Sequence, residues 1–121
     1  MLTERRYWGG KIHRITSGFL NGYSGQVVYV VTNGICVLTA YALSTTATLS
    51  TSVEILPGIP KSKITSCANV ITQVYLSTDF ANFYVNETGT TLMGRSQANK
   101  GFYATITYPI DDDYAEPAAY L

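Results

Sequence analysis

The fold is decided by one stretch of the chain, QVVYVVTNGICVLTAYAL, residues 26–43. Two runs rich in β-branched and aromatic residues flank Asn33-Gly34. This dipeptide favours a two-residue type I′ turn, because both central residues of that turn need a positive φ. The pattern predicts a β-hairpin in which Thr32 faces Ile35 across the turn.

The predicted register gives the hairpin two different faces. One face is apolar or aromatic throughout and belongs against a core; it carries Val27, Tyr29, Val31, Cys36, Leu38 and Ala40. The opposite face is also largely apolar near the turn, although a solvent-facing strand would be polar. It carries Gln26, Val28, Val30, Thr32, Ile35, Val37, Thr39, Tyr41 and Leu43.

The second face needs a cover. A chain of 121 residues can build one two-layer sandwich but hardly a third layer. We therefore expect a second copy of the chain to cover it, with extra strands or loops of the same chain as the alternative. The predicted subunit-contact residues are Val28, Val30, Ile35 and Val37, together with Trp8, an anchor for the body or for a neighbouring subunit.

The remaining sequence predicts further strands. Strand patterns occur at residues 11–16, 44–53, 64–76, 80–85, 91–93 and 102–108, and no helix is predicted. Residues 54–61 contain two prolines and a glycine and are predicted as a fixed loop. Turn signals about every ten residues predict an all-β, antiparallel sandwich or jelly roll. We divide the chain into a lead-in segment with the first strand (1–16), a sandwich (17–110) and an acidic, mobile tail (111–121).

Composition narrows the class of protein. Hydrophobic residues make up 46% of the chain and charged residues only 13%, with a formal net charge of zero. This composition suits an extracellular or virion protein, and it gives no reason to expect nucleic-acid binding or attraction to anionic lipid. No apolar run predicts membrane insertion, and the first residues lack the apolar core of a signal peptide. Release by cell lysis, or as a fragment of a larger protein, is therefore expected for a protein that works outside the cell.

The residues that usually carry chemistry are sparse. The two cysteines, Cys36 and Cys67, are predicted to be buried free thiols, with a single bridge as the alternative. His13, the sole histidine, is interpreted as a surface or subunit-contact residue. Ser96 lacks the second glycine of a nucleophile elbow. We therefore predict no catalytic residue, no cofactor and no metal site.

Carboxylates leave one enzymatic alternative open. Glu54 could face Asp79 or Glu87 across a cleft, as a glycosidase requires, but solvated carboxylates at turns are ordinary. The run Asp111–Asp113 lacks the interleaved glycine and the downstream glutamate of a calcium loop.

Tyrosine is the one residue type in excess, with ten copies. Aromatic faces beside amides and carboxylates bind sugar rings, because the ring covers C–H groups while the polar groups bond the hydroxyls. Such combinations occur in or near the predicted loops, although most of the tyrosines are expected to be core or subunit contacts. The predicted receptor-binding residues are Tyr23, Tyr75, Asp79, Phe80, Asn82 and Tyr84.

Four motifs, in this order, resemble the small head domains at the ends of phage tail fibres and baseplate appendages. YWGGKIHR (7–14) is similar to their Trp-x-Gly-Lys-x-Ile-Tyr-Arg start, with His13 in place of the usual tyrosine. ILPGIP (55–60) resembles a shortened form of their Leu-Pro-x-Gly-x-x-Pro loop. NETGTTL (86–92) and YATITYP (103–109) are similar to their "dGtv" turn and their closing "itYp" strand.

The resemblance implies a homotrimeric, non-enzymatic tip module of a virion. Such a module binds a host cell-surface saccharide or protein and joins other tail proteins through the segment at Trp8. The alternatives are a purely structural trimer of the tail or capsid and a fragment of a glycan depolymerase. Because the binding residues of these heads vary, the resemblance assigns no site residue.

Overall fold

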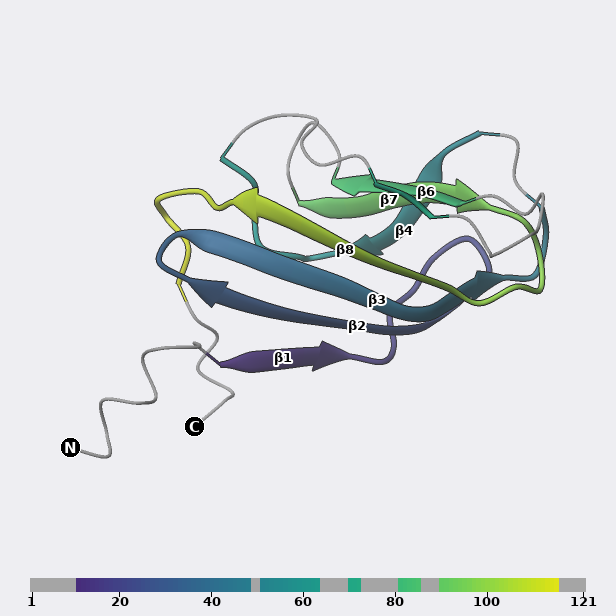
Figure 1. Cartoon of the computed structure of the whole chain (residues 1–121), viewed down its shortest axis with the longest axis horizontal. Coiled ribbons are helices and arrows are strands. Elements are labelled where there is room, and N and C mark those ends of the chain that lie inside the picture. Colours follow the sequence, from purple (N-terminus) through teal and green to yellow (C-terminus); the bar gives the residue numbers. More distant parts are fainter. Residues whose placement is uncertain (1–10, 49–50, 64–69, 73–80, 86–89, 116–121) are drawn as a thin grey trace.

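The computed structural model describes residues 11–48, 51–63, 70–72, 81–85 and 90–115. Within these residues the regular elements are all strands: β1 (Ile12–Ile15), β2 (Tyr23–Thr32), β3 (Ile35–Thr45), β4 (Val53–Pro57), β5 (Val70–Thr72), β6 (Ala81–Val85), β7 (Thr91–Ser96) and β8 (Phe102–Pro109). They form two antiparallel sheets, sheet A in the order β1-β2-β3-β8 and sheet B in the order β4-β7-β6-β5 (Figure 1). The predicted all-β, antiparallel class is confirmed, and the arrangement is compatible with a β-sandwich.

The hairpin at Asn33-Gly34 organises sheet A. Thr32 pairs with Ile35 as predicted, and φ is 53° at Asn33 and 79° at Gly34. Both values lie in the left-handed region that a type I′ turn requires. The strands on either side are longer than predicted, because β2 begins at Tyr23 and β3 continues to Thr45.

A β-bulge changes the faces of β3 beyond the middle of the strand. Ala40 pairs with Ala104 and Leu43 pairs with Phe102, so β3 carries one more residue than β8 over this interval. Ala42 lies at the bulge with a φ of 49°. An extra residue reverses which side chains point inward. The prediction that Leu43 lies on the second face was therefore wrong: its side chain is fully buried in the core.

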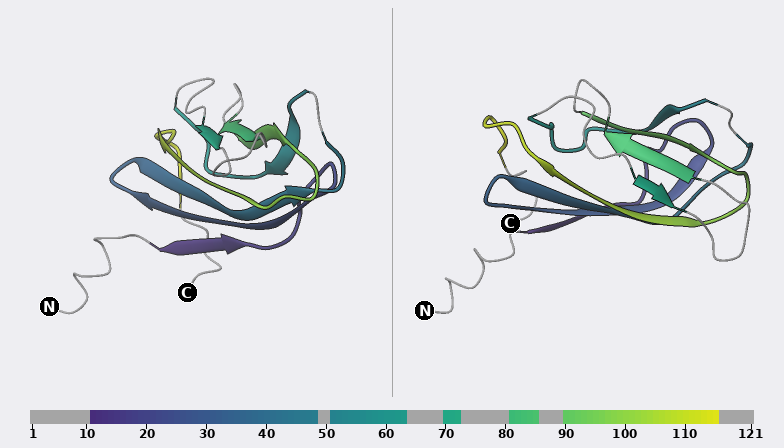
Figure 2. Two further views of the ribbon diagram at one scale, coloured as in Figure 1. Left: turned by 45° about the vertical axis from the view of Figure 1, so that its right-hand side comes forward. Right: turned by 45° about the horizontal axis from the view of Figure 1, so that its top comes forward.

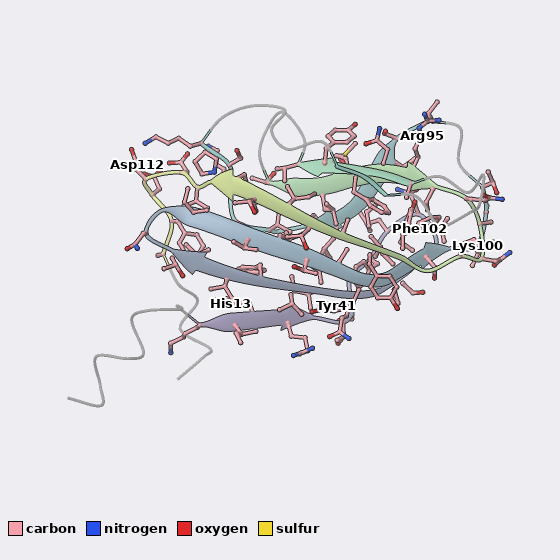
Figure 3. All side chains as sticks on the ribbon, viewed as in Figure 1. His13, Tyr41, Arg95, Lys100, Phe102 and Asp112 are labelled. Carbon is pink, nitrogen blue, oxygen red and sulfur yellow. The ribbon has the colours of Figure 1, made fainter. Side chains whose placement is uncertain are left out.

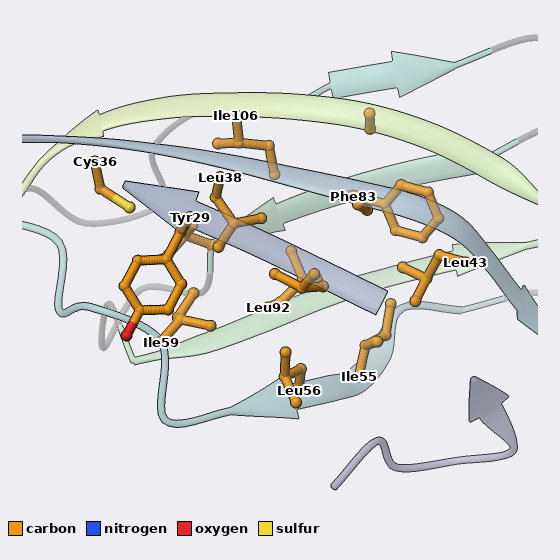
Figure 4. Packing of buried hydrophobic residues seen from close by; sticks show 14 of the residues in the cluster. Tyr29, Cys36, Leu38, Leu43, Ile55, Leu56, Ile59, Phe83, Leu92 and Ile106 are labelled. Atoms are coloured by element: carbon orange, nitrogen blue, oxygen red, sulfur yellow. The ribbon is translucent and has the colours of Figure 1, made fainter. Parts of the chain in front are cut away.

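The core lies between the two sheets. Figure 2 shows the layers from two further directions, and Figure 4 shows side chains from both sheets meeting between them. Sheet A contributes Leu38, Leu43 and Ile106, and sheet B contributes Phe83 and Leu92, all of them at most 1% exposed. These alternating apolar side chains hold the two sheets together.

The region from residue 44 to 61 differs from its prediction. The strand expected over 44–53 ends at Thr45, and β4 covers Val53–Pro57, where a loop was predicted. The two prolines and the glycine do not prevent a strand here, because β4 lies at the edge of sheet B and Pro57 is its last residue. A register shift after Glu54 buries Ile55 and Leu56 side by side.

His13 lies inside the protein. Its side chain is 1% exposed, and its ring stacks on Tyr29 with centroids 4.6 Å apart and an interplanar angle of 10°. The interpretation of His13 as a surface or subunit-contact residue was therefore wrong. Because β1 pairs with β2, the end of the predicted lead-in segment is part of sheet A.

The start of the predicted acidic tail contacts the body. The Asp111 amide donates to the Lys61 carbonyl at 2.8 Å, and the Lys61 ammonium lies 3.5 Å from the Asp111 carboxylate. Lys63 pairs with Asp112 at 3.0 Å in the same way. Residues 111–115 thus continue the fold beyond β8.

Candidate functional site

Tyr23 does not lie where a receptor could reach its ring. The side chain is 5% exposed, and its hydroxyl forms a 2.7 Å hydrogen bond with the Ser96 hydroxyl. The ring meets Phe83 edge to face at 6.5 Å. Burial raises the pKa of the Tyr23 hydroxyl, an effect that the bond to Ser96 opposes. Tyr23 therefore joins β2 to β7 within the core, and the prediction of a receptor-binding role does not fit this placement.

Asn82 and Tyr84 lie together on the outer face of sheet B. Both are partly exposed, while the alternate residues of β6 point into the core. Their cross-strand neighbours on β7 are Arg95 and Met93. The other predicted receptor-binding residues, Tyr75, Asp79 and Phe80, lie outside the described residues.

The predicted subunit contacts share the outer face of sheet A. Val28 and Val30 are partly exposed, and Ile35 and Val37 are 39% and 42% exposed. Ile12 pairs with Val30 and extends the apolar surface onto β1, with 61% of its side chain exposed. We call Ile12, Val28, Val30, Ile35 and Val37 the apolar patch. Trp8 lies outside the described residues.

A second group of side chains occupies the other end of the same face, near the bulge. Gln26 is the cross-strand partner of Tyr41, and Arg14 donates a hydrogen bond from Nη1 to Oε1 of Gln26. The Tyr41 ring meets the Tyr103 ring edge to face at 6.3 Å. We call Arg14, Gln26, Tyr41 and Tyr103 the aromatic row, because they cross sheet A from β1 to β8. Figure 3 labels Tyr41 of this row, and also His13, which is buried on the opposite face of the sheet.

The aromatic row is exposed. Tyr41 is 44% exposed and Tyr103 is 58% exposed, although large aromatic residues are usually more covered. A pair of hydroxyls lies one step closer to the turn, where the oxygens of Thr39 and Thr105 are 3.2 Å apart. Flat ring faces thus lie beside an amide, a guanidinium and hydroxyls on one open surface.

The sequence had placed Tyr41 on this face but had not identified the row. The signal for Tyr103 was available, because the alternation of residues 102–108 leaves Tyr103 on the side opposite the core. The link to Arg14 was not visible, because it depends on how β1 pairs with β2.

In the part of the chain that the structure describes, no group of three or more His, Cys, Asp or Glu side chains is arranged to hold a metal ion. Of the three carboxylates considered for glycoside hydrolysis, the described residues include Glu54 alone, on β4 and exposed to solvent. Within the same residues no helix has the length and hydrophobicity needed to cross a membrane.

Comparison with known proteins identifies no relative. No family model matches the chain, and neither the curated proteins nor the solved structures contain a significant match.

Proposed function

We propose that this chain is a non-enzymatic, homotrimeric tip module of a phage tail, and that it binds a saccharide on the surface of the host cell. The order of the four motifs supports the class of protein. The observation that carries the proposal is the apolar patch, which presents hydrophobic side chains from three neighbouring strands to solvent.

The patch is suited to contact between identical subunits. Contiguous exposed apolar surface of this kind usually marks an interaction site. None of its five residues is charged, so burying the patch leaves no unpaired charge in the contact. A copy of the chain packed on this patch would supply the third layer that one chain is too short to build.

The assembly is tested by substituting one residue of the patch. Val37→Asp should convert a trimer into a monomer at micromolar concentration, because an unpaired carboxylate would be buried in the contact. Light scattering coupled to size-exclusion chromatography measures the mass. The matched control is Leu20→Asp, since Leu20 is 38% exposed but lies in the loop before β2. A monomeric native protein, or a Leu20→Asp variant that dissociates equally, would contradict the proposed trimer.

Adhesion is tested separately with host cells. The native trimer should sediment with host cells, and prior removal of surface polysaccharide should abolish this binding. A trimer that leaves every host cell unbound would favour the purely structural alternative. Hydrolysis of host polysaccharide that disappears in Glu54→Gln, Asp79→Asn or Glu87→Gln variants would favour the depolymerase alternative.

A further inference from the structure

We infer that the aromatic row is a saccharide-binding site, and that it selects a pyranose carrying a carboxylate, as in a hexuronic acid. This inference deepens the proposed function, because it names the part of the surface that binds and the chemical class of the sugar. The inference assigns binding to Tyr41 and Tyr103, which are exposed to solvent, instead of to the buried Tyr23.

The two tyrosines provide the stacking surface. Tyr41 and Tyr103 come from neighbouring strands and contact each other edge to face, so each ring restricts the movement of the other. The electron-rich face of an aromatic ring attracts the polarised C–H groups on one side of a pyranose. Two χ angles per tyrosine keep the entropic cost of ordering low. The pair can therefore hold a sugar ring without a pocket.

The bulge in β3 positions this surface. Beyond Ala40 the strand carries the extra residue, and the side chains of both Tyr41 and Ala42 are exposed. Gly25 lies opposite, where an added Cβ would be only 2.8 Å from the Ala42 carbonyl oxygen. β-Bulges commonly redirect a side chain at a functional site. Here the bulge leaves the Tyr41 ring beside Tyr103 while Leu43 enters the core.

Arg14 supplies the selectivity for an anionic sugar. Gln26 is a neutral partner, so the bond from Nη1 does not neutralise the positive charge of Arg14. Among the described residues, neither Asp nor Glu shares the outer face of sheet A with it. A guanidinium binds a carboxylate through two parallel hydrogen bonds. The Gln26 amide and the Thr39 and Thr105 hydroxyls remain to bond ring hydroxyls.

The aromatic row and the apolar patch can act in the same assembly. Tyr41 follows Val37 by four residues of β3, which is about 13 Å along a strand. A contact centred on Ile35 and Val37 therefore leaves the tyrosines at its rim. The row is then repeated at each subunit, so several weak sites act together on one polysaccharide.

The site is tested with two matched ligands, methyl glucuronide and methyl glucoside, which differ in the carboxylate. Saturation-transfer NMR on the full chain should show binding of both, with tighter binding of the glucuronide. Tyr41→Ala and Tyr103→Ala should each weaken both ligands by about tenfold. Arg14→Gln should remove the preference for the glucuronide over the glucoside. Leu20→Ala, in the loop before β2, is the control and should bind like the native protein.

Each contrary result has a distinct meaning. Absence of saturation transfer to both ligands, or an equal loss in Leu20→Ala, would overturn the site. Equal affinity for the two glycosides would overturn the role of Arg14. A monomeric Tyr41→Ala variant would show that the row is a contact between copies instead. If native protein and tyrosine variants bind host cells equally, the site is wrong and the proposed function stands; if the native protein itself binds no host cells, the proposed function falls.

Discussion

Gly94 shows how closely single residues are fitted between the sheets. It lies on β7, where an added Cβ would be 2.5 Å from the Asn82 carbonyl oxygen and 2.5 Å from Cδ1 of Phe83. The carbonyl belongs to the neighbouring strand and cannot move without disturbing the ladder. This position therefore requires the absence of a side chain rather than an unusual φ.

We predict that Gly94→Ala lowers the free energy of unfolding by about 1 to 3 kcal/mol through overpacking. Denaturant titration measures the change. Gly101→Ala is the matched control, because its added Cβ would meet Ala42 at an ordinary 3.5 Å, and its effect should stay within about 0.5 kcal/mol. Equal effects of the two substitutions would contradict the packing described here.

The thiol of Cys36 makes the stability of the folded protein depend on pH. The structure places it as a buried free thiol, as predicted, while Cys67 lies outside the described residues. Burial raises the pKa of Cys36 to about 11, although a hydrogen bond with Tyr108 opposes the shift. The folded state therefore favours the neutral thiol, and the unfolded chain ionises first as the pH rises.

The neutral Cys36 thiol therefore stabilises the folded state fully below pH 9, and this stabilisation is lost as the pH rises toward 11. In a Cys67→Ser background, this single thiol should reduce stability by up to about 2.5 kcal/mol over that interval. Denaturation at a series of pH values measures the slope. Cys36→Ala should show a shallower slope, and an unchanged slope would exclude the thiol as the cause.

The residues of the core were largely predictable where strict alternation holds. Val27, Leu38 and Ile106 are buried as their spacing indicates. Tyr23 was not predictable, because it follows a glycine-rich loop and its hydroxyl partner, Ser96, comes from a distant strand. When a buried polar atom has its hydrogen-bond partner on a distant strand, the neighbouring sequence gives no sign of that burial.

At the scale of elements, a single residue sets the faces of β3. Deleting Ala42 would remove the bulge and turn Leu43 and Thr45 outward. We predict a loss of at least about 3 kcal/mol, because a buried leucine is lost from the core. Ala42→Gly is the control, because it changes the residue at the bulge and keeps the register of β3. It relieves a φ of 49° and should leave stability unchanged or raise it by up to about 1 kcal/mol. Equal melting temperatures for the deletion and the substitution would contradict the importance of the register.

The hairpin and the closing strand could be predicted, but the bulge and β4 could not. The dipeptide Asn33-Gly34 by itself predicts a type I′ turn. Ala42 carries no such signal, because alanine has no preference for a positive φ. Pro57 argued against a strand, and only its position at a sheet edge makes it acceptable. The positions of bulges and sheet edges depend on how strands pair. A single stretch of sequence does not contain this information.

At the scale of the whole molecule, sheet A has two unlike faces. Its inner face completes the core, and its outer face carries the apolar patch at one end and the aromatic row at the other. The register of the hairpin predicted four residues of the patch, Val28, Val30, Ile35 and Val37, since too many apolar residues pointed away from one core; Ile12 was added by the pairing of β1 with β2. The sequence did not predict the row, because four strands from both ends of the chain must first come together.

The pairing of β3 with β8 determines when the protein can fold. β3 lies between β2, its immediate neighbour in the chain, and β8, which follows all the other described strands. The hairpin tip is also secured late, since the Ile110 amide donates to the Gly34 carbonyl at 2.9 Å. Pairings between distant segments form slowly because a long loop must close first. Until residues 102–110 emerge from the ribosome, β3 exposes an unpaired edge, and a nascent chain in this state is open to aggregation with its neighbours.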